Sequence, residues 1–147
     1  LEKHRIGGER LMIELTESAI IGDPDLALSV LGELKALNAR VAMDDFGTGY
    51  SNLAYLQRLP IDVLKIDRSF VEHMVDDRDK VAIVRTIQHL AETLGMRTTA
   101  EGVETADQAR LLSALGCDFG QGYLFARPMN STAALEFWRQ SRTKPIF

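Results

Sequence analysis

Short apolar runs alternate with amphipathic segments along most of the chain, and this alternation limits the fold more than any other feature. Five runs have the length and apolar character of buried strands: 11–15, 40–44, 63–66, 96–100 and 120–125. The helices expected between and after them cover residues 24–37, 52–59, 80–94, 105–116 and 131–140. Repeated strand–helix units predict a parallel sheet with right-handed crossovers, either an open doubly wound sheet or a barrel.

The ends of these helices carry residues that satisfy free backbone groups. The expected N-caps are Asp23, Ser51, Thr105 and Ser131. Pro24 suits a first helical turn, and Gln108 has the spacing of a capping box with Thr105. Gly95 stands where the helix over 80–94 is expected to end.

The composition is that of one ordinary globular domain or a part of one. The chain has 147 residues, 46% of them hydrophobic, and 17 basic against 21 acidic residues give a formal charge of -4. This balance argues against a DNA or RNA polymer as partner, because such sites need a clustered basic excess. No apolar run approaches the roughly 20 residues of a membrane span, so we expect no membrane contact from this segment. The single cysteine, Cys117, excludes an internal disulfide, and we expect a cytoplasmic protein.

Ionisable and amide side chains lie at the ends of the expected strands, where parallel α/β enzymes place their chemistry. These residues are Glu14, Asp44, Asp45, Lys65, Asp67 and Glu101, with Gln121 inside the fifth strand. Any one of them is equally well explained as a helix cap or a structural ion pair. Together, the carboxylates would repel one another unless a cation lay among them.

The ligand types favour magnesium or manganese over zinc. His4, His73 and His89 do not have the spacing of a metal-binding pair, and we expect them on the surface. A set of carboxylate oxygens suits Mg²⁺ or Mn²⁺. The adjacent pair Asp44 and Asp45 offers ligands for two ions, the usual means of hydrolysing phosphodiesters. The alternative for this pair is a cap at the start of a loop.

A glycine-containing loop follows the two aspartates. It consists of Phe46, Gly47, Thr48, Gly49 and Tyr50. Two glycines this close are more often part of a turn than of a ligand site, although they allow a close approach of the backbone to a ligand. Because the loop comes directly after two carboxylates at a strand end, we interpret it as a candidate active-site lid.

Five ordered motifs together resemble the EAL-domain family, the bacterial phosphodiesterases that act on cyclic di-GMP. They are ELTES at 14–18, DDFGTGYS at 44–51, LKID at 64–67, AEGVE at 100–104, and GQGYLF at 120–125 followed by Arg127 and Pro128. The one small departure is Asn52, where the family most often has a serine. The resemblance implies a TIM-barrel-like (β/α) fold and hydrolysis of cyclic di-GMP to the linear dinucleotide.

The resemblance also implies a role for each matching residue. The metal ligands would be Glu14, Asp44 and Asp45, holding two Mg²⁺ or Mn²⁺ ions. Glu17 would tether the loop. Lys65 would contact the attacking water or the scissile phosphate, unless it forms only a surface ion pair, and Glu101 would hold or activate water. The residues expected beside the metals or the substrate are Asp67, Glu104, Gln121 and Pro128.

The name-giving Glu-Ala-Leu motif and a metal-binding asparagine of the family do not occur upstream of Glu14. The chain therefore resembles the C-terminal part of one such domain, because a full barrel needs about 250 residues. We expect an incomplete barrel of about five parallel strands, whose exposed edges favour a homodimer. We further expect an incomplete metal site, an inactive fragment, and sensory or GGDEF-type domains in the full protein.

Two other interpretations remain. The first is a module that binds cyclic di-GMP or a protein partner without cleaving the nucleotide. The second is a barrel enzyme of unrelated chemistry, which the five motifs make improbable. The presence of both aspartates, Lys65 and Glu101 favours an active parent enzyme.

Overall fold

The structure is a computed structural model of the chain, and it describes residues 1–17, 19, 22–49 and 53–141. Its five strands are β1 (Met12–Thr16), β2 (Arg40–Phe46), β3 (Val63–Ile66), β4 (Arg97–Ala100) and β5 (Phe119–Gly120). They form one sheet in the order β1-β2-β3-β4-β5, and every neighbouring pair is parallel. The predicted five-stranded parallel sheet is therefore confirmed, with a strand order that follows the sequence.

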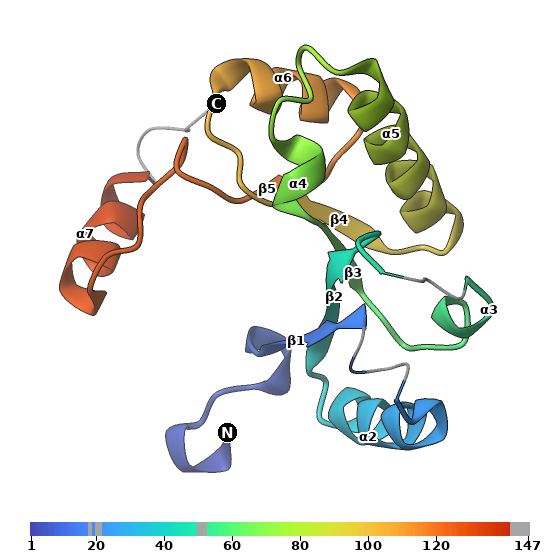
Figure 1. Cartoon of the computed structure of the whole chain (residues 1–147). Coiled ribbons are helices and arrows are strands. Elements are labelled where there is room, and N and C mark those ends of the chain that lie inside the picture. The colour runs from blue at the N-terminus through green and yellow to red at the C-terminus, as the bar shows by residue number, and fades with distance from the viewer. Residues whose placement is uncertain (18, 20–21, 50–52, 142–147) are drawn as a thin grey trace.

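Helices lie along the outer side of the curved sheet. The helices of the described residues are α2 (Pro24–Ala36), α3 (Leu53–Leu56), α4 (Arg68–Val71), α5 (Arg78–Thr93), α6 (Ala106–Ala114) and α7 (Ser131–Ser141), with short 3-10 turns at Glu2–His4 and Gly8–Arg10. Figure 1 shows the strands as an arc with α2, α3, α5 and α6 around it, whereas α7 stands apart from the sheet.

The core fills the space between the sheet and the outer helices. All four residues of β3 are buried, as expected for the central strand of a parallel sheet. Leu64 and Ile66 of this strand contribute to one apolar cluster that includes Leu31 of α2 and Val84 of α5. This packing fixes the strand ends, which carry the polar residues.

Two of the predicted N-caps are confirmed and one is wrong. Asp23 Oδ1 accepts a hydrogen bond from Leu26 N at 3.0 Å, and Thr105 forms its capping box. At α7 the cap is Asn130, whose Oδ1 accepts from Ala133 N at 3.0 Å. The predicted cap Ser131 is instead the first helical residue. The remaining predicted cap, Ser51, lies outside the described residues.

The helices differ from the prediction most in the segments of α3, α4 and α5. In place of the helix predicted over 52–59, the described residues contain the shorter helix α3, Leu53–Leu56. The helix predicted over 80–94 begins two residues earlier, at Arg78. Asp77 caps this longer helix by accepting from Asp79 N at 2.9 Å. Helix α4 was not predicted, because four residues are too few to show a periodic pattern.

Of the strand predicted over 120–125, only Gly120 lies in β5, because the chain turns after this residue. Gln121 N donates to Ala100 O at 2.8 Å, and Val103 N donates to Gln121 O at 3.0 Å. Phe125 N then donates to Gly122 O at 3.1 Å, which closes a turn. A Cβ atom on Gly122 would overlap the backbone of Val103. Glycine therefore allows this turn to pack against the end of β4.

Gly122→Ala is expected to lower the free energy of unfolding by about 3 kcal/mol, because the backbone of Val103 cannot yield as a flexible side chain would. Urea unfolding of the purified chain measures this change. The control is Gly32→Ala in α2, where nothing lies within 4 Å of the added Cβ. This second change is expected to stabilise the helix by about 0.5–1 kcal/mol. Equal effects of the two substitutions would contradict the assigned contact.

Strands β1 and β5 form the two edges of the sheet. Met12 on β1 is 39% exposed and Phe119 on β5 is 50% exposed.

Within the described part of the chain, no helix is long and apolar enough to cross a membrane.

Candidate active site

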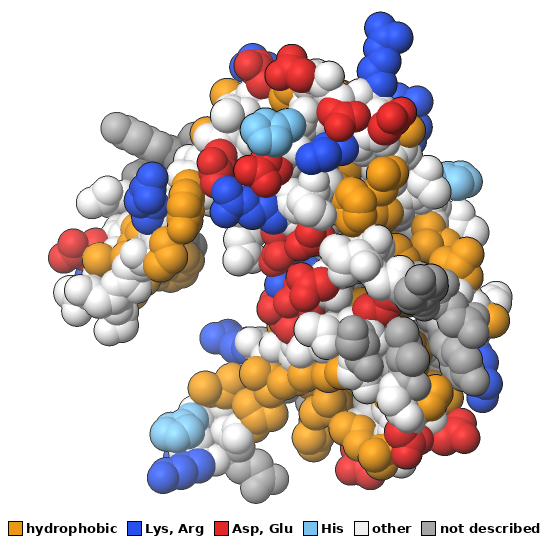
Figure 2. Space-filling view, in the orientation of Figure 1, with side chains coloured by type: hydrophobic (Ala, Val, Ile, Leu, Met, Phe, Trp, Pro, Cys, Tyr) orange, Lys and Arg blue, Asp and Glu red, His pale blue; other side chains and the backbone are white. Residues whose placement is uncertain are grey.

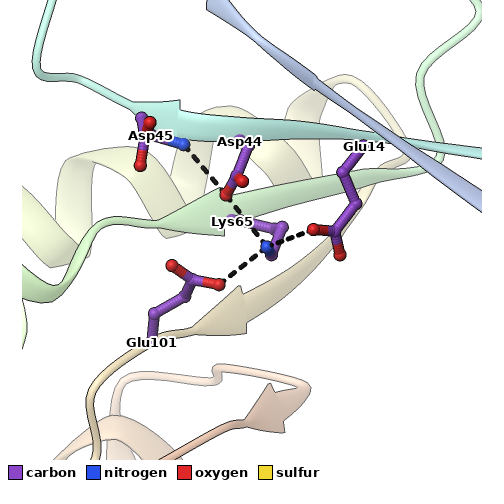
Figure 3. A network of polar contacts seen from close by, with 5 residues as sticks. All are labelled: Glu14, Asp44, Asp45, Lys65 and Glu101. Carbon is purple, nitrogen blue, oxygen red and sulfur yellow. Dashed lines mark hydrogen bonds and ion pairs between the residues drawn. The ribbon is translucent and has the colours of Figure 1, made fainter.

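The carboxyl ends of four strands bring charged side chains to one face of the sheet. In the parallel register Glu14 is aligned with Ala42, and Ala42 with Val63. Side chains two residues apart on a strand share a face, so Asp44 and Lys65 lie on the same side as Glu14. Lys65 is in turn aligned with Thr99, two residues before Glu101. The register thus gathers the predicted residues, as Figure 3 shows.

Lys65 lies at the centre of this group. Its Nζ atom is 2.8 Å from Glu14 Oε2, 2.9 Å from Asp44 Oδ1 and 2.7 Å from Glu101 Oε1. The Lys65 side chain is only 6% exposed, so the alternative of a surface ion pair is wrong. We call Lys65 and its three carboxylate partners the Lys65 cluster.

The charge of Lys65 is stabilised despite its burial. Burial alone lowers the pKa of the ammonium group, but the hydrogen bonds that this group donates to Glu101, Glu14 and Asp44 together outweigh this effect. The pKa of Lys65 is therefore raised above its ordinary value, and the group is a cation at neutral pH. It acts as a counter-ion for carboxylates that would otherwise repel one another.

Asp44 and Asp45 both lie on the side of β2 that faces this cluster. Adjacent residues of a regular strand point to opposite faces. Here the pairing of β2 with β3 shifts between Met43 and Phe46, and Asp45 adopts a left-handed backbone with a φ of 55°. Asp45 N donates to Asp44 Oδ1 at 3.1 Å. This bulge brings both carboxylates to the same site (Figure 3).

The bulge completes a set of oxygen donors suited to a divalent cation. Carboxylate oxygens of Asp44, Asp45 and Glu101 all lie within 4.8 Å of one another, and the three residues are half-buried. Oxygen donors of this kind fit Mg²⁺, Mn²⁺ or Ca²⁺. Glu14, a predicted ligand, is not in this set of three, although its carboxylate also contacts Lys65 Nζ. Glu101, predicted as a catalytic residue, is in the set.

Glu17 is buried beside the predicted lid. Its side chain is 7% exposed, and neither carboxylate oxygen has a hydrogen-bond partner among the described residues. A Cβ atom on Gly49 would lie 3.3 Å from the Glu17 carboxyl group, so the loop backbone passes directly against it. A buried carboxylate without partners is costly. This contact is where the predicted tether of the loop would act.

The rest of the loop is anchored on both sides. Phe46 is buried at the end of β2, and Thr48 Oγ1 donates to Asp45 O at 2.8 Å. Gly47 has a φ of 93°, which favours glycine, and a Cβ atom added there would lie 3.2 Å from the Phe70 ring. The fifth predicted loop residue, Tyr50, lies outside the described residues.

The predicted substrate-side residues divide between two adjoining pockets and a helix cap. A pocket of about 220 Å³ beside Glu101 is lined by Arg68, Gly102, Glu104, Gln121, Gly122 and Tyr123. Pro128 lies in a neighbouring pocket of about 410 Å³ that shares Gln121 and Tyr123 with the first. Asp67 caps α4, its Oδ1 accepting from Ser69 N at 3.0 Å.

Arg68 and Tyr123 are among the pocket residues that were not predicted. Arg68 Nη2 is 2.9 Å from Glu104 Oε1, which links α4 to the loop after β4. The Tyr123 ring lies 4.5 Å from the Arg127 guanidinium carbon and forms a cation–π contact. Both residues lie inside the recognised motifs or next to one, but only the folded chain shows that they line the same space as Glu101.

The fold and the site define a parallel α/β domain with a lysine-centred acidic cluster suited to a divalent cation. Comparison with known families adds a specific match, since the model of the EAL domain covers residues 1–128. The chain belongs to the EAL domain family.

Named relatives agree with this assignment. The chain is 46% identical over 129 residues to the bifunctional diguanylate cyclase/cyclic di-GMP phosphodiesterase MucR of Pseudomonas aeruginosa, covering 88% of this chain and 19% of that protein. A structure of the MucR phosphodiesterase in complex with cyclic di-GMP aligns with a TM-score of 0.87 at 44% identity, over 91% of this chain and 54% of the other.

A metal-containing relative shares the same fold. The Klebsiella pneumoniae BlrP1 structure with manganese and cyclic di-GMP aligns with a TM-score of 0.81 at 36% identity, over 87% of this chain and 33% of the other. The chain thus spans only part of each of these relatives. Its five-stranded sheet matches part of their TIM-barrel-like fold, which confirms the predicted fold class.

Proposed function

We propose that the chain is the C-terminal part of a metal-dependent phosphodiesterase domain that hydrolyses cyclic di-GMP to the linear dinucleotide. The observation that carries this proposal is the convergence of Asp44, Asp45 and Glu101 within 4.8 Å beside the Lys65 ammonium group. The names of the relatives support the choice of substrate. The active species we propose is a longer protein that carries this segment.

The donor set fits magnesium or manganese, with Asp44, Asp45 and Glu101 as the residues that would hold the metal and Glu14 as a further predicted ligand. When bound, the metal supplies Lewis acidity that activates water and offsets the charge of the phosphate. The Lys65 ammonium group would donate to a phosphate oxygen and stabilise the negative charge that develops there. Glu101 would orient the attacking water.

The pocket beside Glu101 supports a place for the rest of the nucleotide. Glu104 offers carboxylate acceptors, and Gln121 offers both a donor and an acceptor. A guanine base presents both kinds of group at its edges. We propose that these two residues, together with Pro128 in the adjoining pocket, lie on the substrate side.

Conversion of cyclic di-GMP by the longer protein tests the proposed function. Chromatography should show the linear dinucleotide with Mg²⁺ or Mn²⁺ present and no product after EDTA treatment. Hydrolysis that continues in EDTA would contradict a metal-dependent mechanism. Binding without hydrolysis in saturating metal would favour the alternative of a non-catalytic module.

We also propose that the longer protein carries further sensory or GGDEF-type domains. The relative MucR is named a diguanylate cyclase as well as a phosphodiesterase, and this chain spans 19% of it. The proposed compartment is the cytoplasm, because one cysteine leaves no pair to form a disulfide within the chain.

We further propose that the 147-residue chain self-associates through the two edges of its sheet. Exposed apolar side chains lie near both edge strands. They are Ile6 and Met12 near β1, Phe119 on β5, and Leu135 and Trp138 on α7. Figure 2 shows such side chains on both flanks of the acidic hollow. Because open strand edges and apolar patches drive association, light scattering should give about twice the 16.4 kDa of one chain. A stable 16.4 kDa species would contradict this proposal.

A further inference from the structure

The side chain of Gln108 makes contacts that its predicted role as a helix cap does not explain. Four polar or charged residues are buried in the described part of the chain: Glu17, Lys65, Thr98 and Gln108. Gln108 Oε1 accepts from Thr105 N at 2.9 Å, which completes the capping box. The same oxygen also accepts from Glu104 N at 2.8 Å, and Nε2 donates to Val71 O at 3.2 Å.

These two additional hydrogen bonds join the segments that carry the site. Glu104 ends the short segment that begins with Glu101, directly after β4. Val71 ends α4, the helix that follows Lys65 and β3. The buried side chain of Gln108 therefore connects α4, which follows Lys65, to the segment that begins with Glu101. The Arg68–Glu104 ion pair spans the same two segments on the exposed side.

We infer that Gln108 is a positioning residue, which holds the 101–104 segment against α4 and so sets the 2.7 Å contact between Lys65 Nζ and Glu101. Without the amide, the segment of Glu101 keeps its strand-end bond from Glu101 N to Ile66 O but loses its buried attachment to α4. The contact of Lys65 with Glu101 then opens more often. Only the expected effect of Gln108 on catalysis rests on the proposed function.

Three substitutions separate positioning from helix capping. Gln108→Met keeps the length of the side chain and removes all three of its hydrogen bonds. Gln108→Glu keeps the acceptor for Glu104 N and Thr105 N but loses the donor to Val71 O. The control, Thr105→Ala, removes the hydroxyl that accepts from Gln108 N at 3.2 Å and leaves the Gln108 side chain in place. It weakens the start of α6 without releasing the 101–104 segment.

The measurement is the exchange of the Lys65 ammonium protons with water, followed by ¹H–¹⁵N NMR of the metal-free 147-residue chain. Gln108→Met should accelerate this exchange roughly five- to tenfold, because each buried hydrogen bond lost shifts a local opening equilibrium by a few-fold. Gln108→Glu, which lacks the donor to Val71 O, should also accelerate the exchange. Thr105→Ala should stay within about twofold of the unsubstituted chain, even though it lowers the melting temperature.

A purely structural role would give a different pattern. Exchange within twofold of the unsubstituted chain in both Gln108 variants, or an equal acceleration by Thr105→Ala, would overturn the inference. If Gln108→Met does not fold, the comparison of Gln108→Glu with Thr105→Ala decides the question.

Hydrolysis by the longer protein tests the proposed function separately from the positioning role of Gln108. In the longer protein, Gln108→Glu should lower kcat for cyclic di-GMP more than it raises KM, because Gln108 touches no substrate-side pocket. Absence of hydrolysis in the unsubstituted protein would contradict the proposed function, while the exchange of Lys65 would still test the positioning role.

Discussion

Asp44→Asn is expected to reduce the turnover of cyclic di-GMP at least about a hundredfold in the longer protein. The substitution keeps the shape of the side chain but removes one of three carboxylates that converge within 4.8 Å. It also removes the charge that contacts Lys65 Nζ at 2.9 Å. Initial rates of product formation, measured by chromatography over a range of Mn²⁺ concentrations, give the change in kcat and in the metal requirement.

The control for this experiment is Asp107→Asn, which removes an equally acidic group from the exposed surface of α6. Asp107 contacts only Arg110, within the same helix, in the described structure. Its loss should leave turnover within about twofold, because exposed ion pairs contribute little. Undiminished turnover in Asp44→Asn would contradict the assignment of this residue to the metal site.

Lys65→Met is expected to lower the free energy of unfolding by about 2–3 kcal/mol in EDTA. Removing one partner of a fully buried ion pair costs about 3–5 kcal/mol, and here the carboxylates left behind are partly exposed to water. The control is Lys35→Met, since Lys35 pairs with Asp62 at 2.7 Å but both side chains are 34% exposed. This control should cost about 1 kcal/mol or less.

The pH dependence gives the Lys65 prediction a definite sign. Because the pKa of Lys65 is higher in the folded chain than its ordinary value of 10.5, the unfolded chain loses the proton first as the pH rises. The stability difference between the unsubstituted chain and Lys65→Met should therefore be complete at neutral pH and decline above about pH 10.5. Urea unfolding at several pH values measures it. A difference that grows as the solution becomes more alkaline would contradict the charged state assigned to Lys65.

The sequence predicts the sheet and most of the site because both follow from short-range patterns. Apolar runs of four to six residues define the strands, and polar residues at their ends reveal which edge of the sheet carries the chemistry. Parallel pairing then brings Glu14, Lys65 and Glu101 together without further information. Once the strands are paired in this order, no further packing information is needed to predict their approach.

The sequence does not predict two kinds of feature: irregular backbone geometry, and contacts that form only when distant elements pack together. The bulge that turns Asp45 toward Asp44 comes from a left-handed backbone that no spacing rule indicates. The short β5 results from the packing of Gly122 against Val103. The contact of Gln108 with Val71 joins residues 37 positions apart, so it appears only once α4 and α6 are placed.

The location of manganese tests the proposed active site most directly. Crystals of the longer protein grown with Mn²⁺ and cyclic di-GMP should show an anomalous-scattering peak within coordination distance of carboxylate oxygens of Asp44, Asp45 and Glu101. The scissile phosphate should lie against the same peak and within hydrogen-bond distance of Lys65 Nζ. The contrary result is manganese bound elsewhere, with no metal contact to these three carboxylates. That result would contradict the proposed metal site and the mechanism that depends on it.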